Sequence, residues 1–200
     1  MPIDVDQNQR REDVAAAAAR LIATRGMGAV TFRNLAGALL CSTTSISHYF
    51  ANRQEILVET YKFVVQRARG RRTRPGADGR AMLASIDHIL PLSDEEFDDW
   101  VVWLCFWTEA LFNPDLAAVQ RLYSRQQRGL IEDNLRALGC APESAHDLSQ
   151  KIMTTIYGIA VQAVFDPEAW TPDAQRAALH DVMKPLSSLL AAAGGARPEG

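Results

Sequence analysis

Residues 31–57 read TFRNLAGALLCSTTSISHYFANRQEIL, and this stretch decides the fold of the N-terminal part of the chain. Thr31 and Ser42 each precede a short run with apolar residues at helical spacing, so both are predicted N-caps. Asn52 starts a further helix, and Glu55 three residues later completes a capping-box pattern. Two short helices, a tight turn and the capped start of a third helix predict a helix-turn-helix.

The sequence on either side extends this motif into a small helical domain. Residues 11–25 have apolar residues at helical spacing and include five successive alanines, which favour helix. Gly26 then stops this helix. The helix that starts at Asn52 continues to the arginine- and glycine-rich stretch RGRRTRPGADG at 69–79, which ends it. We therefore expect a helix-turn-helix domain over 1–52 and a connecting helix over 53–74.

The remainder of the chain, 75–200, also predicts helices only. Proline and glycine breakers divide it into segments of about 79–90, 94–112, 114–138, 142–165 and 172–193. No alternating apolar and polar run indicates a strand. The predicted fold class is all-α, with an N-terminal three-helix helix-turn-helix domain followed by a helical bundle for ligand binding and dimerisation.

The second helix of the motif carries the side chains that a DNA groove requires. A recognition helix lies in the major groove, where hydroxyl groups contact base edges and threonine methyls meet thymine methyls. The expected base-reading residues are Ser42, Thr43, Thr44, Ser45, Ser47 and His48. Arg33 on the preceding helix can contact either a base or a phosphate. We expect Tyr49, Arg53 and Thr31 to bind phosphates at the groove edge and at the helix N-termini.

The distribution of charge supports a polyanionic partner. The net charge is −3, but residues 1–74 carry 12 Lys and Arg against 6 Asp and Glu. A basic N-terminal third on an acidic body suits the binding of double-stranded DNA. No apolar stretch reaches the roughly 18 residues of a membrane span, and the N-terminus lacks the apolar core of a secretory signal. The three cysteines show no metal-ligand spacing. We expect a cytoplasmic protein without metal, cofactor or membrane contact.

These features resemble the TetR/AcrR family of transcriptional regulators. The matching residues occur in the family's order and are Gly26, Thr31, Leu35-Ala36, Ser42, Ile46, Tyr49-Phe50 and Ile56-Leu57. The resemblance implies a homodimer that binds a palindromic operator, usually as a repressor that a small molecule releases. Two positions depart from the family pattern. Leu40 replaces the usual glycine of the turn, and a left-handed backbone there costs leucine more than glycine. Arg53 replaces the more frequent lysine.

Residues 98–112, DDWVVWLCFWTEALF, form the second conspicuous feature. Trp100, Trp103 and Trp107 lie on one helical face, and Glu109 is the only charged residue between Asp99 and Asp115. One interpretation is a buried core helix. The other is a pocket in which tryptophan rings and a carboxylate hold a cation. The expected lining residues are Trp103, Phe106, Trp107, Glu109, Tyr123, Gln127, Met153 and Tyr157.

Within the family, the tryptophan-rich segment is similar to the choline-responsive repressors of betaine synthesis. The stretch WLCFW, the following Asn113-Pro114 and the residues Ile46 to Phe50 carry this similarity. The resemblance implies a quaternary ammonium or polyamine-like effector. The chain departs from this subgroup at Tyr157 and Ala160, where the subgroup carries an acid and a bulky aromatic residue.

The last two predicted helices have apolar faces that suit dimerisation. Pairing two copies through them gives a four-helix interface with two-fold symmetry. The expected contact residues are Ile156, Ile159, Ala163, Val182, Leu186 and Leu189. The alternative is that these faces close the core of a single chain.

An all-helical enzyme or binding protein for a small cationic molecule is the competing interpretation of the whole chain. An enzyme needs convergent catalytic groups, and His88, His146 and His180 are dispersed in the sequence. The sequence has no glycine-rich phosphate loop, nucleophile elbow or histidine pair at metal spacing. We therefore predict no catalytic residue and favour a DNA-binding regulator.

Overall fold

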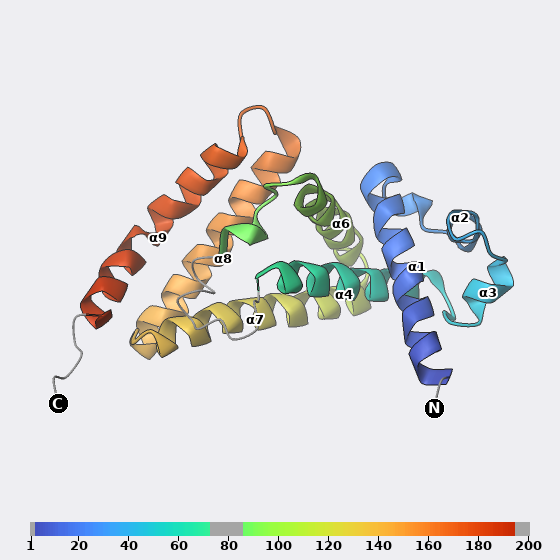
Figure 1. The fold of residues 1–200 in the computed structure, drawn as a ribbon, viewed down its shortest axis with the longest axis horizontal. Helices are drawn as coiled ribbons and strands as arrows, with labels where there is room; N and C mark the ends of the chain where they lie inside the picture. Colours follow the sequence, from blue (N-terminus) through green and yellow to red (C-terminus); the bar gives the residue numbers. More distant parts are fainter. Residues whose placement is uncertain (1–2, 73–85, 195–200) are drawn as a thin grey trace. The chain divides into compact units, whose positions relative to one another are not determined.

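The computed structural model describes residues 3–72 and 86–194, with the side chains of 7–71 and 86–184. Every regular element in these ranges is a helix, which confirms the predicted fold class (Figure 1). None of these helices is long and apolar enough to cross a membrane. Most of the helix predicted at about 79–90 lies outside the described residues, apart from the 3₁₀ helix η2 (Ile86–Ile89).

The described chain forms two compact units. The first comprises Met1–Gly70 and Phe97–Gln120, and the second comprises Arg71–Glu96 and Arg121–Gly200. This division does not follow the linear boundaries expected after residues 52 and 74. The reason is that most of the tryptophan-rich helix and the start of the next one group with the N-terminal residues.

The N-terminal part of the first unit is the predicted helix-turn-helix. It contains α1 (Ile3–Arg25), η1 (Met27–Ala29), α2 (Phe32–Ala38), α3 (Thr43–Ser47) and the start of α4 (Arg53–Arg72). In Figure 1, α2 and α3 lie together on one side of α1. Helix α1 begins earlier than predicted, through a turn of exposed polar residues at 7–10. It ends at Arg25, and the following Gly26 has a φ of 76°, a conformation that glycine adopts readily.

The three predicted N-caps are confirmed. The Thr31 hydroxyl accepts a hydrogen bond from the Asn34 amide at 3.1 Å, and Ser42 accepts one from the Ser45 amide at the same distance. At α4, the side-chain oxygen of Asn52 accepts from the Glu55 amide at 2.9 Å. The Glu55 carboxylate reaches back to the amide of Ala51 at 2.8 Å, which is one residue further than the usual capping box.

A continuous apolar core fixes α3 within this unit. Alanines on the inner face of α1 allow the other helices to approach closely, and the side chain of Ile46 anchors α3 in the same core. The fully buried side chains of this core include Ala18, Ile22, Leu35, Ile46, Phe50 and Ile56. Burial of Ile46 therefore determines which side of α3 faces the core and which side faces outward.

Helix α4 continues from this core onto α6 (Asp94–Ala110) and the start of α7 (Pro114–Ala137). The Tyr61 ring stacks on Phe106 with ring centroids 4.2 Å apart, and the Tyr61 hydroxyl bonds to Gln120. Arg67 pairs with the fully buried carboxylate of Asp99. These contacts connect α4 to the helix that carries the tryptophans.

The second unit is built on α8 (Pro142–Phe165) and α9 (Pro172–Gly194), which run side by side in opposite directions (Figure 1). Their bounds agree closely with the predicted segments 142–165 and 172–193. The inner face of α8 is completely buried and includes Ile152, Ile156, Ile159, Ala160 and Ala163. The buried side chain of Gln175 on α9 donates hydrogen bonds to the carbonyls of Pro91 and Trp170.

Candidate nucleic-acid interface

Helix α3 presents its polar side chains outward. All six predicted base-reading residues are exposed, and Ile46 alone within α3 is buried. The hydroxyls of Ser42 and Ser45 lie 3.0 Å apart, and the Ser47 hydroxyl donates to the Thr44 carbonyl at 3.1 Å. Among the described residues, no hydrogen bond engages the side chains of Thr43 and Thr44. These two threonines therefore present exposed hydroxyl and methyl groups on α3.

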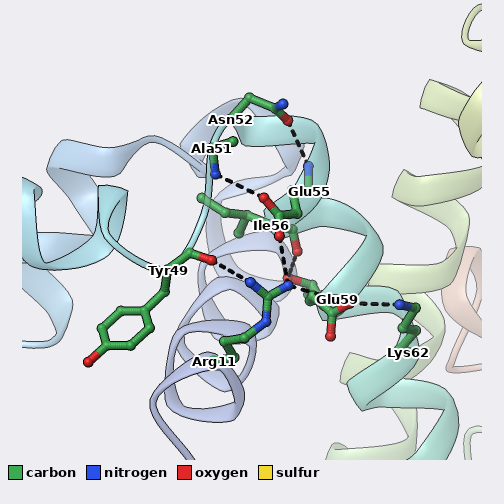
Figure 2. Close-up of polar contacts among 9 residues, drawn as sticks. Arg11, Tyr49, Ala51, Asn52, Glu55, Ile56, Glu59 and Lys62 are labelled. Carbon is green, nitrogen blue, oxygen red and sulfur yellow. Dashed lines mark hydrogen bonds and ion pairs between the residues drawn. The ribbon is translucent and has the colours of Figure 1, made fainter. Parts of the chain in front are cut away.

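The residues around α3 differ in how they are held. Thr31 and Arg33 at the start of α2 are exposed. Tyr49 is half-buried, and its ring meets the His48 ring edge-on with centroids 5.1 Å apart. In Figure 2 the phenol ring points away from the neighbouring helices while the backbone of Tyr49 faces them. The phenol hydroxyl is thus presented outward just after the C-terminal end of α3.

Arg53 differs from the expected phosphate clamp. Its guanidinium donates to the carbonyls of Val30 at 3.2 Å and Met27 at 2.9 Å, and it pairs with the Glu109 carboxylate at 2.9 Å. The first residue of α4 faces the carbonyl groups of the η1 turn, so an arginine there finds acceptors within the protein. In this structure the Arg53 guanidinium bonds to three separate segments of the protein, while 38% of the side chain remains exposed.

Glu109 correspondingly differs from the expected cation-binding carboxylate. Its side chain is 38% exposed and its oxygen is engaged by Arg53. The sequence prediction relied on the absence of another charge nearby in the chain. The partner is 56 residues away in sequence, where no local pattern points to it.

Leu40 occupies the left-handed conformation considered above for the turn between α2 and α3. Its φ is 52°, and no other non-glycine residue in the described ranges has a positive φ. Its side chain is 95% exposed, so no packing compensates the unfavourable backbone. The departure from glycine is therefore accommodated as local strain and not by a rebuilt turn.

We expect Leu40→Gly to raise the free energy of unfolding by about 0.5–1 kcal/mol. Relief of about 1–2 kcal/mol of steric cost is partly offset by the greater entropy of glycine in the unfolded chain. Thermal unfolding monitored by circular dichroism measures the effect. Leu40→Ala is the matched control, because it retains the strained Cβ and removes only the exposed chain. An equal gain in both variants would show that backbone strain is not the cause.

A cleft of about 290 Å³ borders the inner edge of α3. It is lined by residues of α1 and of the helix-turn-helix, namely Arg10, Asp13, Val14, Leu39, Cys41, Ser45, Ile46 and Tyr49. Aliphatic and polar side chains both line it, and Cys41 among them is exposed. The cleft is thus lined both by the N-terminal half of α1 and by α3.

The sequence left two interpretations open for the tryptophans of α6, a buried core and an aromatic cation site, and their burial differs from residue to residue. Trp100 is buried, and the rings of Trp103 and Trp107 meet it edge-on at centroid distances of 4.9 and 5.9 Å. Trp103 and Trp107 themselves remain partly exposed. The buried indole nitrogen of Trp103 has no hydrogen-bond partner among the described residues. Trp100 is thus core, whereas Trp103 and Trp107 form an aromatic surface.

The other expected lining residues have different environments. Phe106 is buried against Tyr61 and belongs to the core of the first unit. The remaining four are in the second unit, where Met153 is buried and Tyr123, Gln127 and Tyr157 are partly exposed.

The predicted dimer residues of α8 require correction. Ile156, Ile159 and Ala163 are buried within the single chain, so their side chains are not available to a partner. The opposite face of α8 is exposed and includes Thr154, Gly158, Gln162 and Phe165. Val182 on α9 is partly exposed, and the side chains of Leu186 and Leu189 lie outside the described residues. The apolar periodicity of α8 correctly identified a buried face. That face packs within the single chain, whereas the sequence prediction placed it against a second copy.

The sequence prediction also missed Arg11, which it used only to mark the start of a helix. The Arg11 guanidinium contacts both the Tyr49 carbonyl and the Glu55 carboxylate (Figure 2). The hydrogen bond from Ala51 lowers the pKa of Glu55 below its ordinary value of 4.5, against the opposing effect of desolvation, and Arg11 lowers it further. Glu55 is therefore a carboxylate at neutral pH and pairs with Arg11 as an ion.

Comparison with known proteins agrees with this geometry. Residues 14–60 match the family model of bacterial regulatory proteins of the tetR family, and residues 78–186 match that of the BetI-type transcriptional repressor, C-terminal. The HTH-type transcriptional regulator PksA of Bacillus subtilis is 25% identical over 174 residues, 84% of each chain. The regulator BetI of Agrobacterium fabrum is 27% identical over 157 residues, 76% of each chain.

Solved structures show the same relationship. A transcriptional regulator from Rhodococcus sp. Rha1 has a TM-score of 0.77 and 24% identity, covering 87% of this chain and 94% of that one. A transcriptional regulator from Saccharomonospora viridis in complex with choline has a TM-score of 0.74 and 26% identity, covering 88% and 96%. The relatives are regulators of transcription and not enzymes, which excludes the catalytic alternative. The chain thus belongs to the TetR family of DNA-binding transcriptional regulators and carries a BetI-type repressor domain at its C-terminus.

Proposed function

We propose that this repressor binds a near-palindromic operator as a homodimer and reads bases through Thr43 and Thr44 of α3. The observation that carries the proposal is the exposed polar face of α3, which Ile46 holds in place. On that face the side chains of Thr43 and Thr44 make no hydrogen bond to any other residue that the structure describes. Threonine offers a hydroxyl to base edges and a methyl group to thymine. The outward phenol of Tyr49 contacts a phosphate and carries no base preference.

Operator binding by variants tests this proposal directly. We expect Thr43→Ala and Thr44→Ala to change the preferred bases, with losses of about tenfold on the parent operator. Tyr49→Phe should weaken binding to all duplexes alike, because a phosphate contact is independent of sequence. Gel-shift titrations against the DNA flanking the gene, followed by randomised duplexes, measure both effects.

Thr24→Ala is the matched control for these variants. The Thr24 hydroxyl donates to the Arg20 carbonyl within α1, so Thr24→Ala removes an exposed threonine hydroxyl that is not on α3. If Thr43→Ala, Thr44→Ala and Tyr49→Phe all bind the operator like the parent, α3 is not the base-reading helix.

We further propose that the exposed face of α8 pairs with the same face of a second copy. Gly158 lies at the middle of that face and has open space beyond it, which allows the close approach of another helix. A two-fold dimer places two α3 helices on half-sites about 34 Å apart, one turn of DNA, or a multiple of that spacing. The protein is accordingly proposed to act in the cytoplasm, where operator DNA is accessible.

The proposed effector is a quaternary ammonium compound, with choline as the first probe. The partly exposed rings of Trp103 and Trp107 supply the π faces that attract such cations, at about 0.5–2 kcal/mol for each contact. The choline complex of the Saccharomonospora viridis regulator supports this choice of ligand class. To release DNA, the effector must bind the DNA-incompetent arrangement more tightly than the competent one.

A further inference from the structure

Helix α3 cannot hold its own conformation. It has five residues, far fewer than an isolated helix needs in water. The Ser42 cap fixes its first turn and Ile46 anchors its middle. The end of the helix, where the chain turns at Tyr49 and Phe50 toward α4, requires a separate restraint.

Arg11 of α1 supplies that restraint. One guanidinium nitrogen donates to the Tyr49 backbone carbonyl, and the other donates to Glu55 Oε1 at 2.8 Å. The guanidinium carbon lies 4.3 Å from the centroid of the Phe50 ring. The planar fork of arginine is suited to two acceptors at once, and lysine cannot reproduce this geometry. A single side chain thus holds the end of α3 from both its backbone and its aromatic anchor.

Glu55 extends the same network into α4. Its second oxygen accepts the Ala51 amide at 2.8 Å, and its own amide donates to Asn52 at 2.9 Å. Glu59, one turn further, lies 3.7 Å from Arg11 and pairs with Lys62 at 2.7 Å. Figure 2 shows the Tyr49 carbonyl and the carboxylates of Glu55 and Glu59 gathered around Arg11. The position of α3 relative to α4 is therefore set through α1.

The geometry also separates the two ends of Tyr49. Its backbone carbonyl is held by Arg11, whereas its phenol ring points the other way (Figure 2). The Arg11 side chain is only 28% exposed and its donors face the protein. Its contribution to DNA binding must therefore pass through the residues that it holds and not through a phosphate contact of its own.

We infer that Arg11 is a positioning residue for operator binding, which fixes the end of the reading helix and the direction of the Tyr49 phenol. The inference rests on the proposed role of α3 and Tyr49 at the operator. It assigns to α1 a function in recognition that the exposed face of α3 does not itself reveal.

The test compares Arg11→Gln with Arg10→Gln. Both variants remove one positive charge from adjacent positions of α1, but Arg10 is exposed and pairs with Asp13 at 3.9 Å. We expect Arg11→Gln to lose at least tenfold more operator affinity than Arg10→Gln, since hydrogen bonds to charged groups contribute about that factor or more. Affinity for random duplex should fall several-fold more in Arg11→Gln than in Arg10→Gln, because the Tyr49 phosphate contact serves every sequence. The salt dependence should be equal in the two variants, because each has lost one charge.

A double-mutant cycle with Tyr49→Phe provides a readout that global stability does not affect. Removal of the Tyr49 hydroxyl should cost several-fold in operator affinity in the parent and less than twofold in the Arg11→Gln background. Arg11→Lys keeps the charge and reaches one acceptor, so it should restore part of the lost affinity. If Arg11→Gln does not fold, the same cycle is measured in Arg11→Lys, with circular dichroism confirming its helices.

The outcomes distinguish this inference from the proposed function. If Thr43→Ala, Thr44→Ala and Tyr49→Phe all bind like the parent, the interface on α3 fails and the inference fails with it. If those variants lose affinity while Arg11→Gln equals Arg10→Gln, only the positioning role is overturned. The positioning role is also overturned if the losses of operator affinity from Arg11→Gln and Tyr49→Phe simply add in the double variant. If Arg11→Gln does not fold, it is overturned when Arg11→Lys binds the operator like the parent.

Discussion

The Gly158→Arg variant is expected to be a folded monomer that binds the operator at least one hundredfold more weakly than the parent. Gly158 is exposed on α8, and apart from its chain neighbours and the adjacent backbone of its own helix, a Cβ built there meets no atom of the described chain within 4 Å. Arginine is also a better helix former than glycine by about 0.8 kcal/mol. The single chain therefore tolerates the change, whereas a second copy packed on the same face does not.

The large effect on DNA binding follows from the linkage of two half-sites. A dimer engages its second half-site at high effective concentration, which raises overall affinity by a factor of about 10²–10⁴ over one half-site. Sedimentation at micromolar concentration reports the assembly, and operator titration reports the affinity. Gly129→Arg on α7 is the matched control, because Gly129 is also helical with open space around it. A Gly158→Arg protein that remains dimeric would exclude this face as the interface.

The choice of Gly158 reflects what the apolar pattern of α8 left undecided. Ile156, Ile159 and Ala163 were expected at the interface, but they are buried in the chain's own core. A charged substitution at Ile159 would unfold the protomer and say nothing about assembly. Helical periodicity identifies a buried face, but it cannot tell an intramolecular neighbour from a second copy.

The accuracy of the sequence predictions follows the range of the interactions involved. The caps at Thr31, Ser42 and Asn52 were predicted correctly because each hydrogen bond closes within three residues. At Leu40 the sequence left a left-handed backbone and a rebuilt turn as alternatives, and the structure has the left-handed backbone. Breaker residues likewise placed the bounds of α7, α8 and α9 to within one or two residues.

Long-range pairs were not predictable in the same way. Arg53 and Glu109 were each assigned an external partner, and the structure pairs them with one another across 56 residues. Arg11 was overlooked because its acceptors are 38 and 44 residues away. A charged side chain on a helix surface carries no local signal of which distant group it meets, so such contacts appear only in the folded chain.

The Glu109→Gln variant is expected to bind choline like the parent but to release the operator poorly. Glu109 is engaged by Arg53 at 2.9 Å, so its carboxylate does not hold the cation at the aromatic surface of Trp103 and Trp107. Arg53 in turn holds the carbonyls of Val30 and Met27 next to α2. The Arg53–Glu109 ion pair therefore joins α6, on which the effector is proposed to bind, to the helix-turn-helix within the first compact unit.

Two separate measurements are needed to observe this difference. Calorimetric titration gives the affinity for choline, and operator titration with and without choline gives the coupling between the two ligands. Coupling energies of about 1–3 kcal/mol correspond to a 5–150-fold change in operator affinity. We expect Glu109→Gln to leave choline affinity within twofold of the parent and to reduce that coupling several-fold. Because coupling is reciprocal, the operator should weaken choline binding by a correspondingly smaller factor in the variant.

Asp115→Asn supplies the control for loss of a carboxylate at the same end of the unit. Asp115 contacts Gln54 of α4 at 3.1 Å and has no contact with Arg53 among the described residues, so its coupling should equal that of the parent. In an Arg53→Gln background, Glu109→Gln should have no further effect on coupling, because its partner is already absent. If Glu109→Gln instead loses choline binding, the Glu109 carboxylate contacts the effector directly, as the sequence alone suggested. Unchanged binding together with unchanged release would show that the Arg53–Glu109 pair does not transmit the signal.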